Sequence, residues 1–416
     1  MTRPSTGLRA APWLDRWLDE HGSGLVTFRR ELHQNPELGY AEHRTTERLA
    51  AALSRAGLQP HVLPVGTGLY CDIGTGKRVV ALRADIDALP LQDVKDVPYA
   101  SSVPGVCHAC GHDAHTTVVL GAALALASGP ALPGRVRVIF QPAEEGVPGG
   151  ALDAIDGGVL KDVERIFALH CDPKLETGRV GLRSGPITAA CDKVDVLLSG
   201  PGGHTARPHR TVDLVYALGR VITDVPGLLS RRADPRHGMS LVWGAVQAGV
   251  APNTIPQSGT VSGTVRMLDR DAWDAAEGLV TALIEQVAAP TGATVEVRYE
   301  QGVPPVSNDV ASTAAFRAGV QAALGPDAAT DTEQSLGGED FAWYLGHVPG
   351  ALARLGVRAP DATEPYLDLH QPTFDIDERA LAVGVRVLAH TALTVLGCRS
   401  RPHRDPGRPI KARTSR

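Results

Sequence analysis

Residues 107–115 are rich in side chains that bind divalent metal ions. The segment reads Cys-His-Ala-Cys-Gly-His-Asp-Ala-His, which places two cysteines, three histidines and an aspartate within nine positions. Cys110 and His112 are two positions apart, and Gly111 between them lets the backbone turn so that both can face one metal pocket. We therefore predict Cys110 and His112 as metal ligands, with the cysteine bound as a thiolate that the metal deprotonates.

Cys107 and Cys110 also form a Cys-x-x-Cys motif, which allows an alternative interpretation. Such a motif can be a redox pair or half of a structural zinc site. The sequence has no second Cys-x-x-Cys, so a structural four-cysteine site is disfavoured. A redox role would require Cys107 to matter for activity.

Two adjacent carboxylates, Glu144 and Glu145, follow the apolar run 136–140. Adjacent carboxylates repel each other unless a cation is present. Their side chains diverge, so one can bind a metal while the other faces the bound water. The residues alone leave open which glutamate takes which part.

Two isolated histidines complete the candidate set. His170 follows the apolar segment 166–169 and His370 lies in Leu-His-Gln-Pro, where either one alone would more often be a core histidine. With Cys110, His112 and one glutamate they give five donors, which suit two metals sharing a ligand better than one tetrahedral zinc. Two ions about 4 Å apart lower the pKa of a bridging water to near 7, and a nearby carboxylate can act as general base. The sequence therefore predicts a dinuclear hydrolytic centre, with Mn, Zn, Co or Ni as candidate ions.

Short apolar strands are predicted to position these groups. Strands over 79–82, 136–140 and 166–169 each end in polar or metal-binding side chains, including Asp85 and Asp87 after the first. Open α/β sheets place their sites at the carboxyl ends of the strands. Helical patterns alternate with these strands, which indicates an α/β fold with a mostly parallel sheet and helices on both faces.

The pattern changes near Lys193, where strands with alternating burial begin. Strands and amphipathic helices then follow over about 110 residues, which indicates a smaller α+β domain inserted into the larger one. A chain of 416 residues is also long enough for two domains. We predict a discontinuous metal-binding domain of residues 1–188 and 303–398, an inserted domain of residues 189–302, and a disordered basic tail of residues 399–416.

The composition disfavours several classes of function. The small net charge of −5 argues against a nucleic-acid binder, which would present a basic face. The start of the chain shows no signal-peptide pattern, and we expect no membrane-spanning run. Six cysteines are too few for a disulfide scaffold. We therefore expect a cytoplasmic protein with neither nucleic-acid nor membrane partners.

Five motifs, in the same order along the chain, resemble the M20 metallopeptidase family, and in particular its amidohydrolase branch of aminoacylases, hippurate hydrolases and auxin-conjugate hydrolases. The motifs are residues 108–113, 141–146, 202–209, 253–256 and 369–372. The resemblance covers about residues 20–395. It implies a catalytic α/β domain with an inserted lid and dimerisation domain. It also implies a specific assignment of the centre, with Glu144 as the base and five ligands, namely Cys110, His112, Glu145, His170 and His370.

The resemblance further assigns three residues of the inserted domain to the substrate. His204 matches a histidine that reaches an active site, generally that of the partner subunit of a homodimer, and steadies the tetrahedral intermediate. Asn253 and Arg266 match residues that bind the free carboxylate of the substrate, for which arginine has a two-pronged geometry. The alternatives are a surface histidine in a glycine turn, an exposed turn asparagine and a strand arginine. Asp87 is expected to orient a ligand from outside the centre.

The sequence as a whole predicts a metal-dependent hydrolase that cleaves N-acyl amino acids to a carboxylic acid and a free amino acid. A dipeptidase or carboxypeptidase on the same scaffold is the alternative enzyme. A non-catalytic protein that binds acyl-amino acids is the alternative class, but it would be expected to lack a ligand or the base. The family often has a glycine run where this chain has residues 146–150, and methionine and glycine are frequent at the positions of Cys107 and Ala114. These departures flank the ligands and leave the substrate open.

Overall fold

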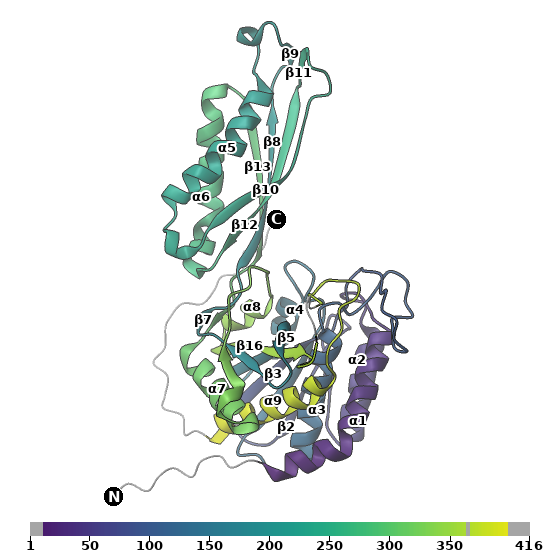
Figure 1. The fold of residues 1–416 in the computed structure, drawn as a ribbon. Helices are drawn as coiled ribbons and strands as arrows, with labels where there is room; N and C mark the ends of the chain where they lie inside the picture. The colour runs from purple at the N-terminus through teal and green to yellow at the C-terminus, as the bar shows by residue number, and fades with distance from the viewer. Residues whose placement is uncertain (1–10, 363–366, 398–416) are drawn as a thin grey trace, which may run out of the picture. The chain divides into compact units, whose positions relative to one another are not determined.

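The computed structural model describes residues 11–362 and 367–397, and these form two compact units (Figure 1). Unit 1 comprises the chain up to Gly185, residues 308–333 and the chain from Trp343 onward. Unit 2 comprises residues 186–307 and 334–342, so it contains the whole of the expected insertion, 189–302. The basic tail predicted for residues 399–416 lies outside the described residues.

Unit 1 is built on one eight-stranded sheet. Its strands are, in sheet order, β1 (His61–Val62), β2 (Leu69–Gly74), β4 (Arg135–Gln141), β3 (Val79–Asp85), β5 (Val163–Glu176), β16 (Gly350–Arg358), β6 (Val180–Leu182) and β15 (Ala329–Asp331). The central strands β4, β3, β5 and β16 are parallel to one another, and β6 and β15 also pair in parallel. The pairings β1–β2, β2–β4 and β16–β6 are antiparallel. The predicted α/β class with a mostly parallel sheet is therefore confirmed.

The helices of unit 1 pack on this sheet and on one another. They are α1 (Pro12–Gln34), α2 (His43–Arg55), α3 (His112–Ser128), α4 (Ala151–Asp156), α7 (Val310–Leu324), the short η4 (Pro326–Ala328) and α9 (Arg379–Gly397). Helix α3 packs against α1, α9 and β3, while α9 also packs against α7 and β16. Among the helices of the described residues, α9 has the length and composition of a membrane span, but 72% of that stretch is buried inside the protein, as expected of a core helix.

Two predicted elements of unit 1 have different bounds in the structure. The apolar pattern of the sequence predicts a helix from about His115 to Ala127, but α3 starts at His112, because Gly111 adopts a left-handed conformation (φ 88°) and turns the chain into the helix there. Strand β5 does not end at Leu169. It continues to Glu176, so His170 lies within the strand, because β16 pairs with β5 beyond this point. That partner strand begins 180 positions later, out of reach of a local pattern.

Unit 2 is an α+β unit with one antiparallel sheet. Its strands are, in sheet order, β10 (Ser240–Ala248), β12 (Ser258–Met267), β8 (Ala190–Ser199) and β13 (Thr294–Val303), and a separate pair is formed by β9 (Gly203–His204) and β11 (Thr254–Ile255). Its helices are α5 (Leu214–Arg232), α6 (Arg270–Ala288) and three short turns, η1 (Pro208–Arg210), η2 (Pro235–His237) and η3 (Ala289–Thr291). Helices α5 and α6 pack together against the sheet. Three short elements, β7 (Gly185–Pro186), β14 (Ser307–Asn308) and α8 (Phe341–Leu345), contain points where the chain passes between the units.

The core of unit 2 is organised around the buried carboxylate of Asp192 on β8. It accepts hydrogen bonds from the Trp273 indole on α6 (2.8 Å) and the Tyr299 hydroxyl on β13 (2.6 Å). The Gly302 amide donates a third (2.9 Å). Because a buried carboxylate is costly without partners, these bonds fix how α6 and two strands meet. The aromatic side chains concerned are therefore structural.

Candidate metal centre

The segments that carry the predicted ligands leave the sheet of unit 1 at one edge. Strands β3 and β4 run in parallel, and their last residues, Asp85 and Gln141, are directly opposite each other. Asp87 follows the first strand, and the glutamate pair follows the second. The N-terminus of α3 and the loop that contains His370 meet there as well, because the His370 amide donates a hydrogen bond to the Ala109 carbonyl (2.7 Å).

The structure brings the five predicted ligands of unit 1 into two groups that share Cys110. The donor atoms of Cys110, His112 and His170 lie within 4.8 Å of one another. Those of Cys110, Glu145 and His370 do so as well. The sulfur of Cys110 is 3.6 Å from His170 Nε2 and 3.3 Å from His370 Nε2. Two donor groups with one common thiol fit a pair of divalent ions that share a ligand, as expected from the number of donors.

His112 is aimed into this centre by Asp87. Its Nδ1 lies 2.9 Å from the Asp87 carbonyl oxygen and 3.2 Å from Asp87 Oδ1, so Nδ1 carries a proton and Nε2 is the ring nitrogen directed into the centre. That Nε2 is buried and has no hydrogen-bond partner among the described residues. It lies 3.8 Å from Glu145 Oε1 and 3.9 Å from Glu144 Oε2. A buried nitrogen facing carboxylates without a partner fits a bound cation.

His170 presents its Nε2 in the same way. Its Nδ1 donates a hydrogen bond to the Cys171 carbonyl (2.8 Å). Nε2, which faces Cys110, is therefore the ring nitrogen that can bind a metal. His370 adopts a left-handed backbone conformation (φ 61°), which is uncommon for a residue other than glycine. Its Nε2 lies 3.3 Å from Glu145 Oε1. Backbone strain of this kind is typical of residues in functional sites, where the position of the side chain is tightly fixed.

His115 lies beside the centre, and its donor atoms form a third group with those of Asp85 and His112. The backbone amide of Cys171 donates a hydrogen bond to His115 Nε2 (2.8 Å), so Nδ1 carries the proton and donates to Asp85 Oδ1 (2.6 Å). Both ring nitrogens are therefore used. That only Cys110 and His112 of the segment 107–115 bind metal stays a prediction.

Asp113 anchors the first turn of α3, a role that the sequence did not suggest. Its Oδ2 accepts hydrogen bonds from Arg29 Nε (2.6 Å) and His33 Nδ1 (2.7 Å), and all three side chains are fully buried. Arg29 also bonds Asp375 (2.8 Å), close in sequence to His370. The spacing of four between Arg29 and His33 puts both on one face of α1, but their partner lies 80 or more positions away and carries no local signal.

The electrostatics of the centre favour a positive charge. Burial raises the pKa of the Cys110 thiol well above its usual range, so the sulfur needs a cation in order to ionise. Burial lowers the pKa of His170 well below its usual range, so its imidazole stays neutral. Burial opposes the charged form of His112, but Asp85 and Cys110 hold its pKa well above the usual value. Metal ions would supply the missing charge and release the thiol proton on binding.

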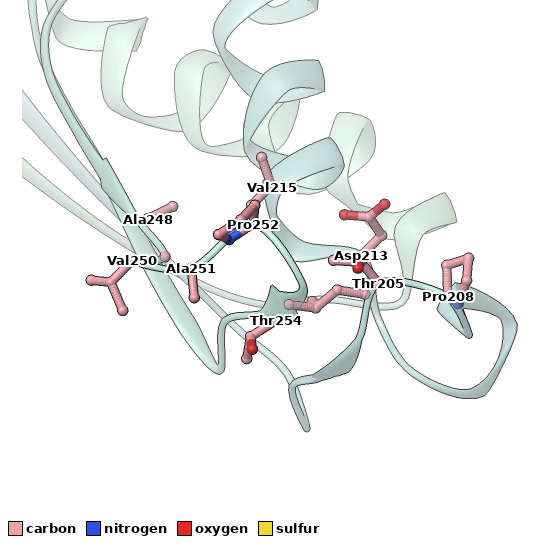
Figure 2. A pocket seen from close by; sticks show the side chains of 11 residues that line it. Thr205, Pro208, Asp213, Val215, Ala248, Val250, Ala251, Pro252 and Thr254 are labelled. Atoms are coloured by element: carbon pink, nitrogen blue, oxygen red, sulfur yellow. The ribbon is translucent and has the colours of Figure 1, made fainter.

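Three predicted site residues belong to unit 2. The β9–β11 pair puts His204 opposite Thr254, and the Thr205 amide donates a hydrogen bond to the Asn253 carbonyl (3.2 Å), so His204 and Asn253 are neighbours. His204 is exposed, and its Nδ1 accepts a hydrogen bond from the Ala206 amide (3.1 Å). A cleft of about 540 Å³ is lined by their sequence neighbours Thr205, Pro252 and Thr254 (Figure 2). The cleft is lined mainly by apolar side chains, among them Val215, Ala248, Val250, Ala251 and Pro252.

Arg266 is far from this pair within unit 2. It lies near the last residue of β12 and bonds the Leu336 carbonyl, whereas β12 begins at Ser258, three residues after β11. Eight residues of extended strand separate Ser258 and Arg266 by about 26 Å. Arg266 therefore lies far along β12 from the β9–β11 pair, which is a separate two-stranded sheet.

Unit 1 is an α/β unit that brings five nitrogen, sulfur and oxygen donors together at the edge of its sheet. This arrangement is that of a metal-dependent hydrolase. Comparison with known proteins gives the family. The chain belongs to peptidase family M20/M25/M40, whose sequence pattern matches residues 81–394. The family inferred from the five motifs is thus confirmed.

Three similar proteins are informative. A Rhodococcus jostii protein with the provisional name glutamate--cysteine ligase 2-3 is 50% identical over 374 residues, which are 89% of this chain but only 46% of that protein. The N-acetylcysteine deacetylase of Bacillus subtilis is 37% identical over 382 residues, 89% of this chain and 97% of the relative. A solved Bacillus subtilis structure, described as a dinuclear metal-binding peptidase of the M20 family, has a TM-score of 0.79 at 34% identity and covers 91% of this chain and 99% of its own.

Proposed function

We propose that this protein hydrolyses the amide bond of N-acyl amino acids, releasing a carboxylic acid and a free amino acid. The observation that carries the proposal is the pair of donor groups around Cys110, with Glu144 beside them as a further carboxylate. The similarity to an enzyme named for removing an acetyl group from N-acetylcysteine supports the class of substrate. More than half of the Rhodococcus relative has no counterpart in this chain, so its ligase name is not carried over.

In this proposal Cys110, His112, Glu145, His170 and His370 hold two divalent ions. When bound, these ions would acidify water and polarise the acyl carbonyl. Glu144 is the proposed base, as the motif resemblance to the family implies. Its Oε2 lies 3.9 Å from His112 Nε2, where it can take a proton from water and return it to the leaving amine.

Contacts to the substrate are assigned to unit 2. His204 would donate to the oxyanion that forms at the acyl carbon, and Asn253 and Arg266 would bind the free carboxylate. Because about 26 Å of strand separates Arg266 from Ser258, the end of β12 that follows β11 and the His204–Asn253 pair, one copy of unit 2 cannot offer all three to one substrate. We therefore propose a homodimer in which each site receives His204 and Asn253 from one subunit and Arg266 from the other.

The surface of unit 2 supports such a dimer. Strand β10 is at the edge of its sheet, where backbone groups are available for pairing with another strand. Its side chains Val242 and Val246 are 64% and 56% exposed, and Val250 next to the cleft is fully exposed. Exposed apolar side chains along an edge strand are a usual feature of a subunit interface. The free thiols of the described cysteines support a reducing compartment, and we place the enzyme in the cytoplasm.

The test is a substrate panel. The purified protein, loaded in turn with Mn, Co, Zn or Ni, is assayed for amino-acid release from N-acetyl, N-benzoyl and long-chain N-acyl amino acids and from dipeptides. We expect turnover of at least one N-acyl amino acid, abolished by a chelator and restored by metal. Turnover of dipeptides alone would favour the alternative that the protein is a peptidase. Binding of N-acyl amino acids by the metal-loaded protein without any turnover would indicate a binding protein instead.

A further inference from the structure

Ala143, the residue immediately before the proposed base, has an unusual backbone conformation. Its φ is 51°, in the left-handed region that residues with a β-carbon rarely adopt. Its side chain is buried and tightly packed, since a β-carbon on Gly39 would lie 3.0 Å from that of Ala143. The Ala143 carbonyl accepts a hydrogen bond from the Gly150 amide (2.9 Å), which closes the loop that carries Glu144 and Glu145. A strained residue at the base of a functional loop must be held by its surroundings.

The buried carboxylate of Glu42 holds Ala143 in place. Glu42 Oε1 accepts a hydrogen bond from the Ala143 amide at 2.8 Å, across 101 positions of sequence. Glu42 stands directly before α2, at the N-cap position, but its side chain makes no capping bond. Glu37 does this instead, accepting from the amides of Arg44 and Thr45. The helix therefore does not need the Glu42 carboxylate, and the packing alone does not explain why a charged group is buried there.

Asp87 binds the backbone amide that follows the proposed base. Its Oδ2 accepts a hydrogen bond from the Glu145 amide (3.0 Å), while its Oδ1 faces His112 Nδ1. The buried carboxylates of Glu42 and Asp87 thus accept hydrogen bonds from the amides of the residues before and after Glu144. We propose that Glu42 is a positioning residue for the reaction, which fixes the left-handed turn at Ala143 and so directs Glu144 toward the centre. The inference rests on the proposed function, in which Glu144 is the base.

The proposal predicts that Glu42 affects catalysis but not metal binding. Asp87 holds the Glu145 amide without help from Glu42, so metal binding survives when Glu42 is replaced. Without its acceptor, however, the Ala143 amide no longer offsets the strain, and the turn relaxes toward an ordinary conformation. A displacement of about 1 Å in a catalytic group costs on the order of 100-fold in rate. Loss of Glu42 should therefore lower kcat and leave KM and metal content almost unchanged.

The test compares Glu42→Leu, which fills the same space without an acceptor, with Glu42→Gln, which retains a carbonyl oxygen for the Ala143 amide. We expect kcat to fall roughly 100-fold in Glu42→Leu and to stay within about threefold of the wild type in Glu42→Gln. Adding Ala143→Gly to Glu42→Leu should restore about tenfold of the loss, because glycine adopts a positive φ without strain. Phe316→Leu, a buried substitution against Phe167 elsewhere in unit 1, is the control for lost stability and should keep kcat.

Amide hydrogen exchange provides a readout that does not depend on activity. In Glu42→Leu the peptide covering residues 141–146 should exchange roughly tenfold faster than in the wild type, and in Glu42→Gln it should not. The proposal is overturned if Glu42→Leu keeps both wild-type kcat and wild-type exchange, or if Ala143→Gly restores nothing. If the wild type turns over no substrate in the panel, the proposed function fails separately, and the exchange comparison still decides whether Glu42 holds the loop.

Discussion

Cys107 and Cys110 are three positions apart, and their thiols differ in how readily they ionise. Cys110 is common to both donor groups, where a cation would stabilise its thiolate. Cys107 is fully buried, and burial raises its pKa to about 11, so its sulfur remains a thiol at neutral pH. Because the thiolate is the species that reacts in thiol–disulfide exchange, the environment of Cys107 disfavours the redox interpretation of the Cys-x-x-Cys motif.

This difference can be measured with one substitution at each position. Cys107→Ala should retain two bound ions and turnover within about threefold of the wild type, since it removes a buried thiol without leaving an unpaired polar group. Cys110→Ala should weaken metal binding by roughly 100-fold or more, because both donor groups lose a ligand. Metal content by mass spectrometry and kcat on the best substrate provide the comparison. An inactive but fully metallated Cys107→Ala protein would revive the redox hypothesis.

The assignment of Glu144 makes a second prediction about single residues. Glu144→Gln keeps the size of the side chain but cannot take a proton, so kcat should fall by about 10³-fold, within the range for loss of a general base. Metal content should not change, because the five proposed ligands are intact. Glu145→Gln is the matched variant at the neighbouring position, and it should lose metal as well as activity. Near-normal turnover by Glu144→Gln would refute its role as the base.

At the scale of elements, caps and buried ion pairs decide where the chain turns toward the site. Three helices begin after an aspartate whose carboxylate accepts an amide of the first turn, namely Asp213 for α5, Asp269 for α6 and Asp309 for α7. Asp309 accepts hydrogen bonds from the Ser312 amide (2.7 Å) and Arg165 Nη1 (2.9 Å), linking α7 to β5, the strand that carries His170. Burial alone would raise the pKa of Asp309, but these partners lower it below its usual value.

The lowered pKa gives a stability prediction with a defined sign. A carboxylate whose folded pKa lies below its unfolded pKa of about 3.9 stabilises the fold above that pH, and the contribution disappears as the pH falls through the folded value. Asp309→Ala should therefore cost about 1 kcal/mol at pH 7, as is typical for a lost cap. The deficit, measured by urea unfolding, should shrink as the pH is lowered below about 4. Asp331→Ala removes a highly exposed carboxylate and should have little effect at any pH. A deficit at Asp309 that does not change with pH would contradict the ionic account.

At the scale of the whole molecule, the proposed homodimer rests on the spacing of the proposed substrate residues in unit 2. A mixture of His204→Ala and Glu144→Gln proteins tests this directly, because each variant alone lacks one essential group in every site. If His204 acts across the dimer, random exchange should give about a quarter of wild-type turnover, since half of the dimers are mixed and each has one complete site. A verified mixed dimer without activity would show that His204 does not act in the partner site.

The proposed interface makes a separate prediction. Lysine at both Val242 and Val246 places charges on the exposed edge strand and should yield a monomer by sedimentation or light scattering. Metal content should remain unchanged, while turnover should fall as far as it does in His204→Ala. Val310→Lys, at an equally exposed valine on α7 of unit 1, serves as the control and should remain dimeric. A fully active lysine variant that remains a dimer would move the interface elsewhere.

The sequence alone determined the fold class, the approximate order of the elements and the set of chemically capable residues. It did so because strand and helix periodicities are local and because metal-binding side chains are rare in such density as in residues 107–115. It could not set the end of β5 or the start of α3, since these depend on a distant partner strand and on the left-handed turn at Gly111. Motif resemblance, rather than spacing, distinguished Glu145 from Glu144.

Only the tertiary structure decided how these residues work together. It brought donors from positions 110 to 370 into two groups that share one thiol, and it gave both ring nitrogens of His115 to other partners. It also assigned two acidic residues, Glu42 and Asp87, to the amides on either side of Glu144. The physical reason is that hydrogen bonds and ion pairs between distant segments have no periodic signature in the sequence. They exist only when the sheet has brought its strand ends to a common edge.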